Sequence, residues 1–304
     1  MLRFLCTSTV ALLCCIASAA ACVNEFGTTI SGGVKVFPES YVPPAVEIDV
    51  QRYRQRIEEL SPKVNAGADY RDISDLAVAY LYVGETEKAI ELLEQAEKMQ
   101  PNEYVIAANL GTAYELAGRN EEALQWIEEG IRRNPHAHDR SEWIHANLLK
   151  AKIAMAADAN WLATHSVTGL DFGTAPLPAH NLQASASNCP TDLSAVISHL
   201  RYQLHERRQF IPGPDPIVAS LMFDLANATA LTSTIEDSLP LYQSSLSLGY
   251  PHPTLLNLRV TSLQELSRHN WLSGWDYISL IMTVLVSIVV IPICLMIFFK
   301  IRRG

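Results

Sequence analysis

The sequence predicts an all-α protein, with a helical-repeat domain of the α-α solenoid type and one C-terminal transmembrane helix. Three observations support this prediction. Apolar and small residues recur at a spacing of 34 residues in the middle of the chain, an uncharged apolar stretch of 22 residues lies near the C-terminus, and a short apolar leader opens the chain. A fixed spacing of this kind is the sequence signature of stacked structural repeats.

The leader covers residues 1–21. It begins with the basic residue Arg3, continues as an apolar run from Phe4 to Ile16, and ends in small residues up to Ala21. A positive start, a short apolar region and an Ala-x-Ala site are what the export machinery and signal peptidase recognise. Residues 1–21 are therefore predicted to be a signal peptide that leaves the mature chain outside the cytoplasm.

Cys22 is a candidate lipidation site. Residues Ala19 to Cys22 resemble the lipobox of bacterial lipoproteins, in which the cysteine is acylated, although Ala19 stands where that motif usually has Leu. The alternative is a disulfide between Cys22 and Cys189, because the other four of the six cysteines lie in the leader or the apolar C-terminal stretch. Acylation of Cys22 would exclude that disulfide.

Residues 22–47 are irregular and rich in glycine and proline. Within them, a glycine turn at Gly32 and Gly33 separates two short runs of β-forming residues, which predicts a short N-terminal hairpin. An isolated hairpin is only marginally stable, so this one would need to pack against the helices.

The membrane helix is predicted at residues 278–299, which contain no charge. At 1.5 Å per residue this stretch would reach about 33 Å, enough for a hydrocarbon core of about 30 Å. Aromatic residues Trp271 and Trp275 precede it and the basic residues of the tail, 300–304, follow it. Because basic residues remain on the cytoplasmic side, we expect a single-pass protein with its N-terminal domain in the periplasm or outside the cell and a short cytoplasmic tail.

The formal net charge of the chain is −9 at pH 7. Four basic residues lie in the leader and the tail, so the exported part is more acidic still. An acidic surface repels polyanions, which excludes nucleic acid as a partner.

The repeats are clearest between residues 70 and 137. Small, aromatic and turn-forming residues of the first unit recur 34 positions later in the second. The first set is Leu76, Ala77, Tyr80, Gly84, Ala89, Leu93, Ala96 and Pro101, and the second is Leu110, Gly111, Tyr114, Gly118, Ala123, Ile127, Gly130 and Pro135. This pattern resembles the tetratricopeptide repeat. The resemblance implies two antiparallel helices per unit, with a glycine turn inside the unit and a proline after its second helix.

Stacked repeats need neighbours and caps. We therefore expect residues 48–160 to form tetratricopeptide-like repeats, with clear units at 70–103 and 104–137 and a divergent helix after them. Residues 161–190, rich in glycine, proline and small polar residues, are predicted to be an irregular loop. Residues 191–270 return to helical patterning and are predicted to be further degenerate helical repeats.

The sequence carries no nucleotide-binding, nucleophile-elbow or zinc-protease motif, so no enzyme activity and no cofactor are predicted. The strongest metal candidate is the group His136, His138, Asp139 and His145, because imidazole and carboxylate groups are common ligands. We favour a polar turn between helices, with Asp139 or Ser141 capping the next helix, and predict no metal.

The resemblance also implies a binding groove. In tetratricopeptide arrays the first helix of each repeat lines the concave face. The positions of this chain that match the groove-facing positions are Arg71, Ser74, Val78, Leu81, Tyr82, Val105, Ala108, Thr112, Glu115 and Leu116. The lining is mostly apolar and suits an extended segment or amphipathic helix of a protein partner. The alternative is that Val78, Leu81 and Leu116 pack against the next unit.

The preferred hypothesis is a non-catalytic protein-interaction scaffold of the cell envelope, with an exported repeat domain tethered to the membrane. One alternative is an envelope enzyme or metal-binding protein with its site in residues 161–190. A second alternative is a membrane sensor that acts through a partner, because the cytoplasmic tail is too short to hold a signalling domain.

Overall fold

The structure is a computed structural model that describes residues 41–45, 47–180 and 192–290. Every regular element in these ranges is helical, so the all-α prediction is confirmed for the described part of the chain. The predicted hairpin in residues 22–47 lies almost entirely outside the described residues, as do the leader, Cys22 and Cys189.

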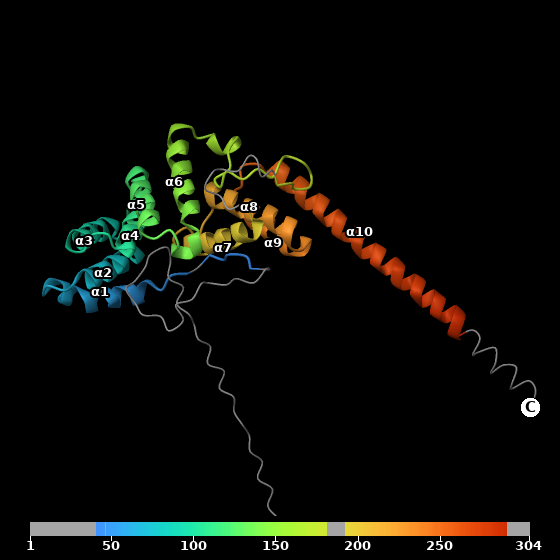
Figure 1. Ribbon diagram of the computed structural model, residues 1–304, viewed down its shortest axis with the longest axis horizontal. Coiled ribbons are helices and arrows are strands. Elements are labelled where there is room, and N and C mark those ends of the chain that lie inside the picture. Colours follow the sequence, from blue (N-terminus) through green and yellow to red (C-terminus); the bar gives the residue numbers. More distant parts are fainter. Residues whose placement is uncertain (1–40, 46, 181–191, 291–304) are drawn as a thin grey trace, which may run out of the picture.

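The helices follow one another along the chain with short connections (Figure 1). The α-helices of the repeat half are α1 (Val50–Asn65), α2 (Tyr70–Tyr82), α3 (Thr86–Met99), α4 (Tyr104–Leu116) and α5 (Asn120–Arg133). A short 3-10 turn, η1 (Ala137–Arg140), leads into α6 (Glu142–Ala157), and a second, η2 (Trp161–Ala163), follows it. The remaining helices are α7 (Leu193–Phe210), α8 (Pro216–Thr232), α9 (Ile235–Ser247), α10 (Pro253–Leu285) and a short π-helical turn, η4 (Val286–Val290).

Two helix pairs, α2 with α3 and α4 with α5, correspond to the two predicted repeats. Gly84 and Gly118 connect the helices of each pair at φ values of 83° and 77°. Side chains disfavour this left-handed region, which explains the glycine at both positions. The second helices end at Met99 and Arg133, two residues before Pro101 and Pro135.

The repeats pack closely because small residues face one another. Gly111 of α4 lies so near α5 that a Cβ added to it would approach Ile127 Cδ1 to 2.4 Å and the Ile127 amide nitrogen to 3.2 Å. Gly130, on α5, has more room, since its added Cβ would be 3.7 Å from its nearest neighbours. A bidentate ion pair also joins the two second helices, with Arg133 Nη2 2.7 Å and Nη1 2.9 Å from the carboxylate of Glu97.

The apolar side chains form two cores, one among α1 to α5 and one among α6 to α10. Helix α6 belongs to both, because Ala146 and Leu149 pack in the first core while Ile144 and Leu148 pack in the second. In Figure 1, α6 stands between the repeat half and the α7–α9 half. This helix therefore couples the two halves of the domain.

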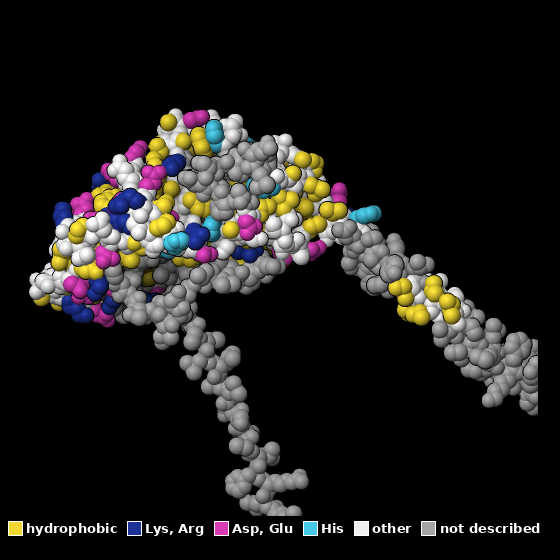
Figure 2. Space-filling model, in the orientation of Figure 1, with side chains coloured by type: hydrophobic (Ala, Val, Ile, Leu, Met, Phe, Trp, Pro, Cys, Tyr) yellow, Lys and Arg dark blue, Asp and Glu magenta, His cyan; other side chains and the backbone are white. Residues whose placement is uncertain are grey.

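Helix α10 leaves the body of the protein (Figure 1). Leu256 and Leu263 anchor its first part in the second core, whereas apolar side chains between Ile281 and Ile288 are exposed. Figure 2 shows these side chains as a yellow band on the projecting helix. Within the described residues, no helix has both the length and the hydropathy that a membrane crossing requires. The predicted span 278–299 extends beyond residue 290, where the description ends.

The close approach of α4 and α5 leads to a prediction with a matched control. Gly111→Ala should lower the free energy of unfolding by about 1–3 kcal/mol, because Ile127 and the backbone of α5 must shift to admit the methyl group. Gly130→Ala should be neutral or stabilising by up to about 1 kcal/mol, because its methyl group has room and alanine favours the helix. Urea unfolding followed by circular dichroism measures both, and equal effects of the two substitutions would contradict the close approach.

Candidate functional site

The ten predicted groove residues lie on α2 and α4, and the structure buries most of them. Arg71 is exposed, and Val105 and Leu116 are half-buried. The buried set is Ser74, Val78, Leu81, Tyr82, Ala108, Thr112 and Glu115. The first helices of the two repeats, α2 and α4, bury part of this set against each other. Asn109 on α4 donates a hydrogen bond of 3.3 Å to the hydroxyl of Ser74 on α2.

Other helices contribute to the rest, since Tyr53 of α1 stacks on Tyr82, His145 and Lys152 of α6 contact Glu115, and the C-terminal part of α7 reaches both Tyr82 and Glu115. The last residue of α7, Phe210, stacks on the ring of Tyr82 with centroids 5.1 Å apart. Three residues earlier, Arg207 reaches Glu115 of α4. Nearer its start, Gln203 donates a hydrogen bond of 2.9 Å to the Ser141 hydroxyl. Side chains near the end of α7 thus occupy two positions, Tyr82 and Glu115, of the face on which a partner helix was predicted to bind.

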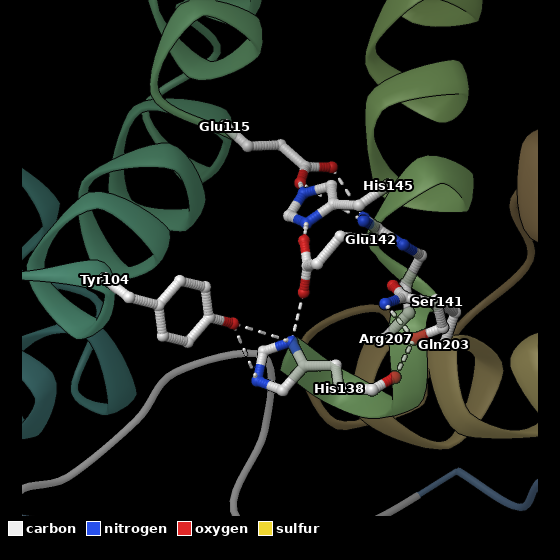
Figure 3. A network of polar contacts seen from close by, with 8 residues as sticks. All are labelled: Tyr104, Glu115, His138, Ser141, Glu142, His145, Gln203 and Arg207. Atoms are coloured by element: carbon white, nitrogen blue, oxygen red, sulfur yellow. Dashed lines mark hydrogen bonds and ion pairs between the residues drawn. The ribbon is translucent and has the colours of Figure 1, made fainter. Parts of the chain in front are cut away.

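Glu115 is the centre of this contact (Figure 3). Arg207 Nη1 lies 2.6 Å from one carboxylate oxygen and Nη2 lies 3.3 Å from the other. Lys152 of α6 donates to the first oxygen at 2.6 Å, and His145 Nε2 lies 2.7 Å from the second. The Glu115 side chain is only 4% exposed, so this carboxylate joins α4, α6 and α7 inside the protein.

The network continues from His145 to a second buried carboxylate (Figure 3). His145 Nδ1 lies 3.6 Å from Glu142, and the same carboxylate pairs with His138. The Tyr104 hydroxyl lies 3.3 Å from His138 Nδ1. Carboxylate and imidazole groups therefore alternate from α4 through α6 to η1.

The turn that carries His138 has an unusual backbone. His138, Asp139 and Arg140 have φ values of 47°, 55° and 64°, so three consecutive residues with side chains occupy the left-handed region. Such conformations persist only when their surroundings hold them in place. Here the pair between His138 and Glu142 does so, together with a hydrogen bond of 2.6 Å from the Ser141 hydroxyl to the His138 carbonyl. The expectation that Asp139 or Ser141 caps α6 is wrong, because no side chain makes the cap hydrogen bond.

Charge pairing controls the ionisation of the network. Burial alone would raise the pKa of Glu115, but the charges of Arg207, His145 and Lys152 hold that pKa well below its ordinary value. Burial likewise opposes ionisation of Glu142, whose pKa is nevertheless lowered by His138 and His145. Burial would lower the pKa of His145, yet the hydrogen bond to Glu115 and the nearby carboxylate of Glu142 raise it. Both carboxylates are therefore ionised at neutral pH, and Arg207 and Lys152 supply positive charge against Glu115.

The histidines of the predicted metal candidate serve this network instead of forming one cluster. His145 lies between Glu115 and Glu142, His138 pairs with Glu142, and His136 is exposed. Among the described residues, no group of three or more His, Cys, Asp or Glu side chains could hold a metal ion. Arg207 and Lys152 already neutralise Glu115, which explains why this carboxylate is unsuited to a cation ligand.

A hollow remains at the end of α7, beside the stacked rings of Tyr82 and Phe210. Its volume is about 720 Å³, and three of the predicted groove residues, Leu81, Tyr82 and Leu116, line it. Ile48 and neighbouring residues from the segment before α1 complete its wall. The Tyr82 ring is held from its other side by Tyr53 of α1, with centroids 3.9 Å apart. The hollow is thus a preformed, mostly apolar depression with an aromatic wall.

The sequence analysis missed the contributions of Arg207, Phe210 and Ile48. Arg207 lies 92 residues from its partner Glu115, and no repeat spacing connects the two. Glu115 was the available signal, since it is the acidic residue in a mostly apolar predicted groove. A buried carboxylate needs a basic partner, so its presence predicts a Lys, Arg or His nearby. The sequence alone did not indicate which of the many arginines supplies it.

The stacked helix pairs, the glycine turns and the concave face define a helical-repeat protein of the α-solenoid class. The repeats are tetratricopeptide repeats, since the model of that family matches residues 74–138. The match covers most of α2 and all of α3, α4 and α5. No curated protein and no solved structure matches the chain.

The buried histidine gives a pH-dependent prediction. A histidine whose pKa is raised by folding stabilises the protein fully below its unfolded pKa, about 6.5, and this contribution is lost as pH rises through the folded pKa. His145→Gln should therefore lower the free energy of unfolding most near pH 6, with a smaller loss at pH 9. Urea unfolding across this range measures the effect. His136→Gln is the matched control on an exposed histidine, and a pH-independent loss in His145→Gln would contradict the charged pair.

Proposed function

We propose that the chain is a protein-interaction scaffold tethered to a membrane of the cell envelope. Tetratricopeptide repeats generally mediate contacts between proteins, and residues 74–138 belong to that class of repeat. The observation that carries the proposal is the hollow of about 720 Å³ lined by Leu81, Tyr82 and Leu116. It lies at the part of the predicted groove that α7 leaves uncovered.

The hollow suits one or two apolar side chains of a partner. Its walls combine aliphatic residues with the stacked rings of Tyr82 and Phe210, and burial of apolar area stabilises a complex by about 25 cal/mol per Å² before the costs of association. Hot spots in protein interfaces are typically such preformed pockets filled by an aromatic or aliphatic anchor. The partner is therefore an extended segment or amphipathic helix whose apolar residues occupy the hollow.

The tether is proposed from the C-terminal part of the chain. Residues 278–299 are uncharged, and the described side chains from Ile281 to Ile288 project apolar surface away from the domain. An amphipathic or spanning helix buries such surface in lipid. The basic residues after it support the orientation with the repeats outside the cytoplasm. Tethering would raise the effective concentration of the repeat domain near other membrane proteins.

Site-specific photocrosslinking in intact membranes tests the binding surface. A photoreactive residue in place of Leu116 should give a discrete protein adduct, because this half-buried residue lines the hollow. Phe210→Glu should reduce the adduct about tenfold or more by placing a charge in the apolar wall. The same photoreactive residue in place of Met99, exposed at the end of α3, is the control and should give none.

An adduct at Leu116 that persists in Phe210→Glu, or equal adducts at Leu116 and Met99, would contradict the proposed surface.

The tether is checked in the same membranes by alkaline extraction. The full chain should stay in the membrane pellet, and a chain lacking residues 278–304 should be released. If the shortened chain is released only when it also carries Cys22→Ser, an acyl group at Cys22 also holds the protein in the membrane.

A further inference from the structure

A second hollow, distinct from the one beside Tyr82, lies where residues 161–174 fold over α8 and the start of α10. Its volume is about 450 Å³, within the range of about 300–1,000 Å³ that is typical of small-molecule sites. Asp224 of α8 lines it together with Phe223 and Tyr250, whose rings stack with centroids 4.1 Å apart. The hollow therefore combines a buried carboxylate with an aromatic wall.

Asp224 is only 3% exposed and is incompletely paired. The hydroxyls of Ser166 and Thr168 both donate to its Oδ2, at 2.8 Å and 2.6 Å. In the described part of the chain, no hydrogen bond reaches Oδ1. Burial raises the pKa of Asp224 to about 6, so the carboxylate is mostly ionised at pH 7. Asp224 lines the hollow, and its Oδ1 is not among the described side-chain atoms that are sealed from solvent without a partner, so a donor in the hollow can reach it.

Arg259 is the nearest cation, but its donors are used elsewhere. Its Nη1 donates to Asn227 Oδ1 at 2.5 Å and its Nη2 to the Phe172 carbonyl at 2.8 Å. Further contacts go to the carbonyls of Gly173 and Ala175. This fully buried guanidinium fastens the loop to α10, and it leaves few donors for an anionic ligand in the hollow.

Two histidines that line the hollow are engaged with backbone carbonyls. His252 Nε2 lies 3.0 Å from the Leu162 carbonyl, and His165 Nδ1 lies 2.9 Å from the Trp161 carbonyl. A carbonyl only accepts, so these two nitrogens are donors whose hydrogens are already used. The lining thus offers the Asp224 carboxylate as an acceptor, which calls for a ligand that donates hydrogen bonds.

We propose that this hollow binds a primary ammonium group, which donates to Asp224 Oδ1 and lies beside Tyr250, since the Arg259 guanidinium already lies over the Phe223 ring at 5.1 Å. An ammonium group has three donors and no acceptor, which matches the lining. It also neutralises the buried carboxylate with a charge-assisted hydrogen bond. The group belongs either to a small alkylamine or to a polypeptide, as a lysine side chain or an amino terminus.

Isothermal titration of the purified full chain in detergent tests the proposal, with n-butylammonium, n-butanol and n-butyrate as matched probes. The ammonium should bind about tenfold or more tightly than the alcohol or the carboxylate, because only it supplies charge and donors to Asp224. Equal binding of the three probes, or preference for butyrate, would overturn the proposal. Two further probes distinguish the sources of the ammonium group. If Nα-acetyl-lysine amide or trialanine amide also binds, the ammonium group comes from a polypeptide. If only n-butylammonium binds, the ligand is a small amine.

Asp224→Asn should weaken n-butylammonium about tenfold or more. The matched control is Asp171→Asn, because Asp171 is an exposed carboxylate at the same hollow and should change the affinity less than about twofold. If Asp224→Asn does not fold, Leu255→Lys gives an independent test, since it places an ammonium group in the hollow while leaving the bonds of Asp224 intact. Unchanged butylammonium affinity in folded Asp224→Asn or in Leu255→Lys would refute the site.

Discussion

The ion pair between Arg207 and Glu115 is the constraint on which the arrangement of the domain depends. Stacked repeats normally contact only their neighbours, so their concave face is open to other molecules. Here a buried carboxylate on the concave face binds an arginine 92 residues further along the chain, at 2.6 Å. Desolvation makes such a carboxylate unfavourable without a partner, which explains why α7 must lie across the repeats. Lys152 and His145 bring α6 to the same carboxylate.

This contact also determines where a partner can bind. Phe210 and Arg207 of α7 contact Tyr82 and Glu115 on α2 and α4, and the apolar hollow beside Tyr82 lies where α7 ends. The other end of the domain is different in character. There the loop over α8 forms a polar hollow around Asp224, from which α10 continues toward the proposed membrane tether. The proposed protein-binding surface and the proposed ammonium site thus lie in different parts of the domain, one beside Tyr82 and one around Asp224.

The repeats could be predicted because their signals are local and recur at a fixed spacing. Gly84 and Gly118 occupy turns that require positive φ, and the small residues lie where helices meet. The crossing of α7 could not be predicted, because it depends on one pair of charges distant in sequence. The left-handed turn at His138 was also beyond sequence reasoning, since glycine is the usual signal for it and none is present. Asp224 belongs to no motif, and only folding brings Ser166 and Thr168 to it.

A double-mutant cycle on Glu115→Gln and Arg207→Met tests the central claim most directly. Unfolding free energies of the full chain would be measured in urea at pH 7 for both single variants and the double variant. Each single change should destabilise the protein by about 3 kcal/mol, because Glu115→Gln removes the carboxylate that three cationic or imidazole groups contact and Arg207→Met removes the guanidinium that contacts both of its oxygens. The double variant should be less destabilised than the sum by more than about 1 kcal/mol. Additive effects, or an Arg207→Met protein as stable as the unaltered chain, would show that this ion pair does not hold α7 on the repeats.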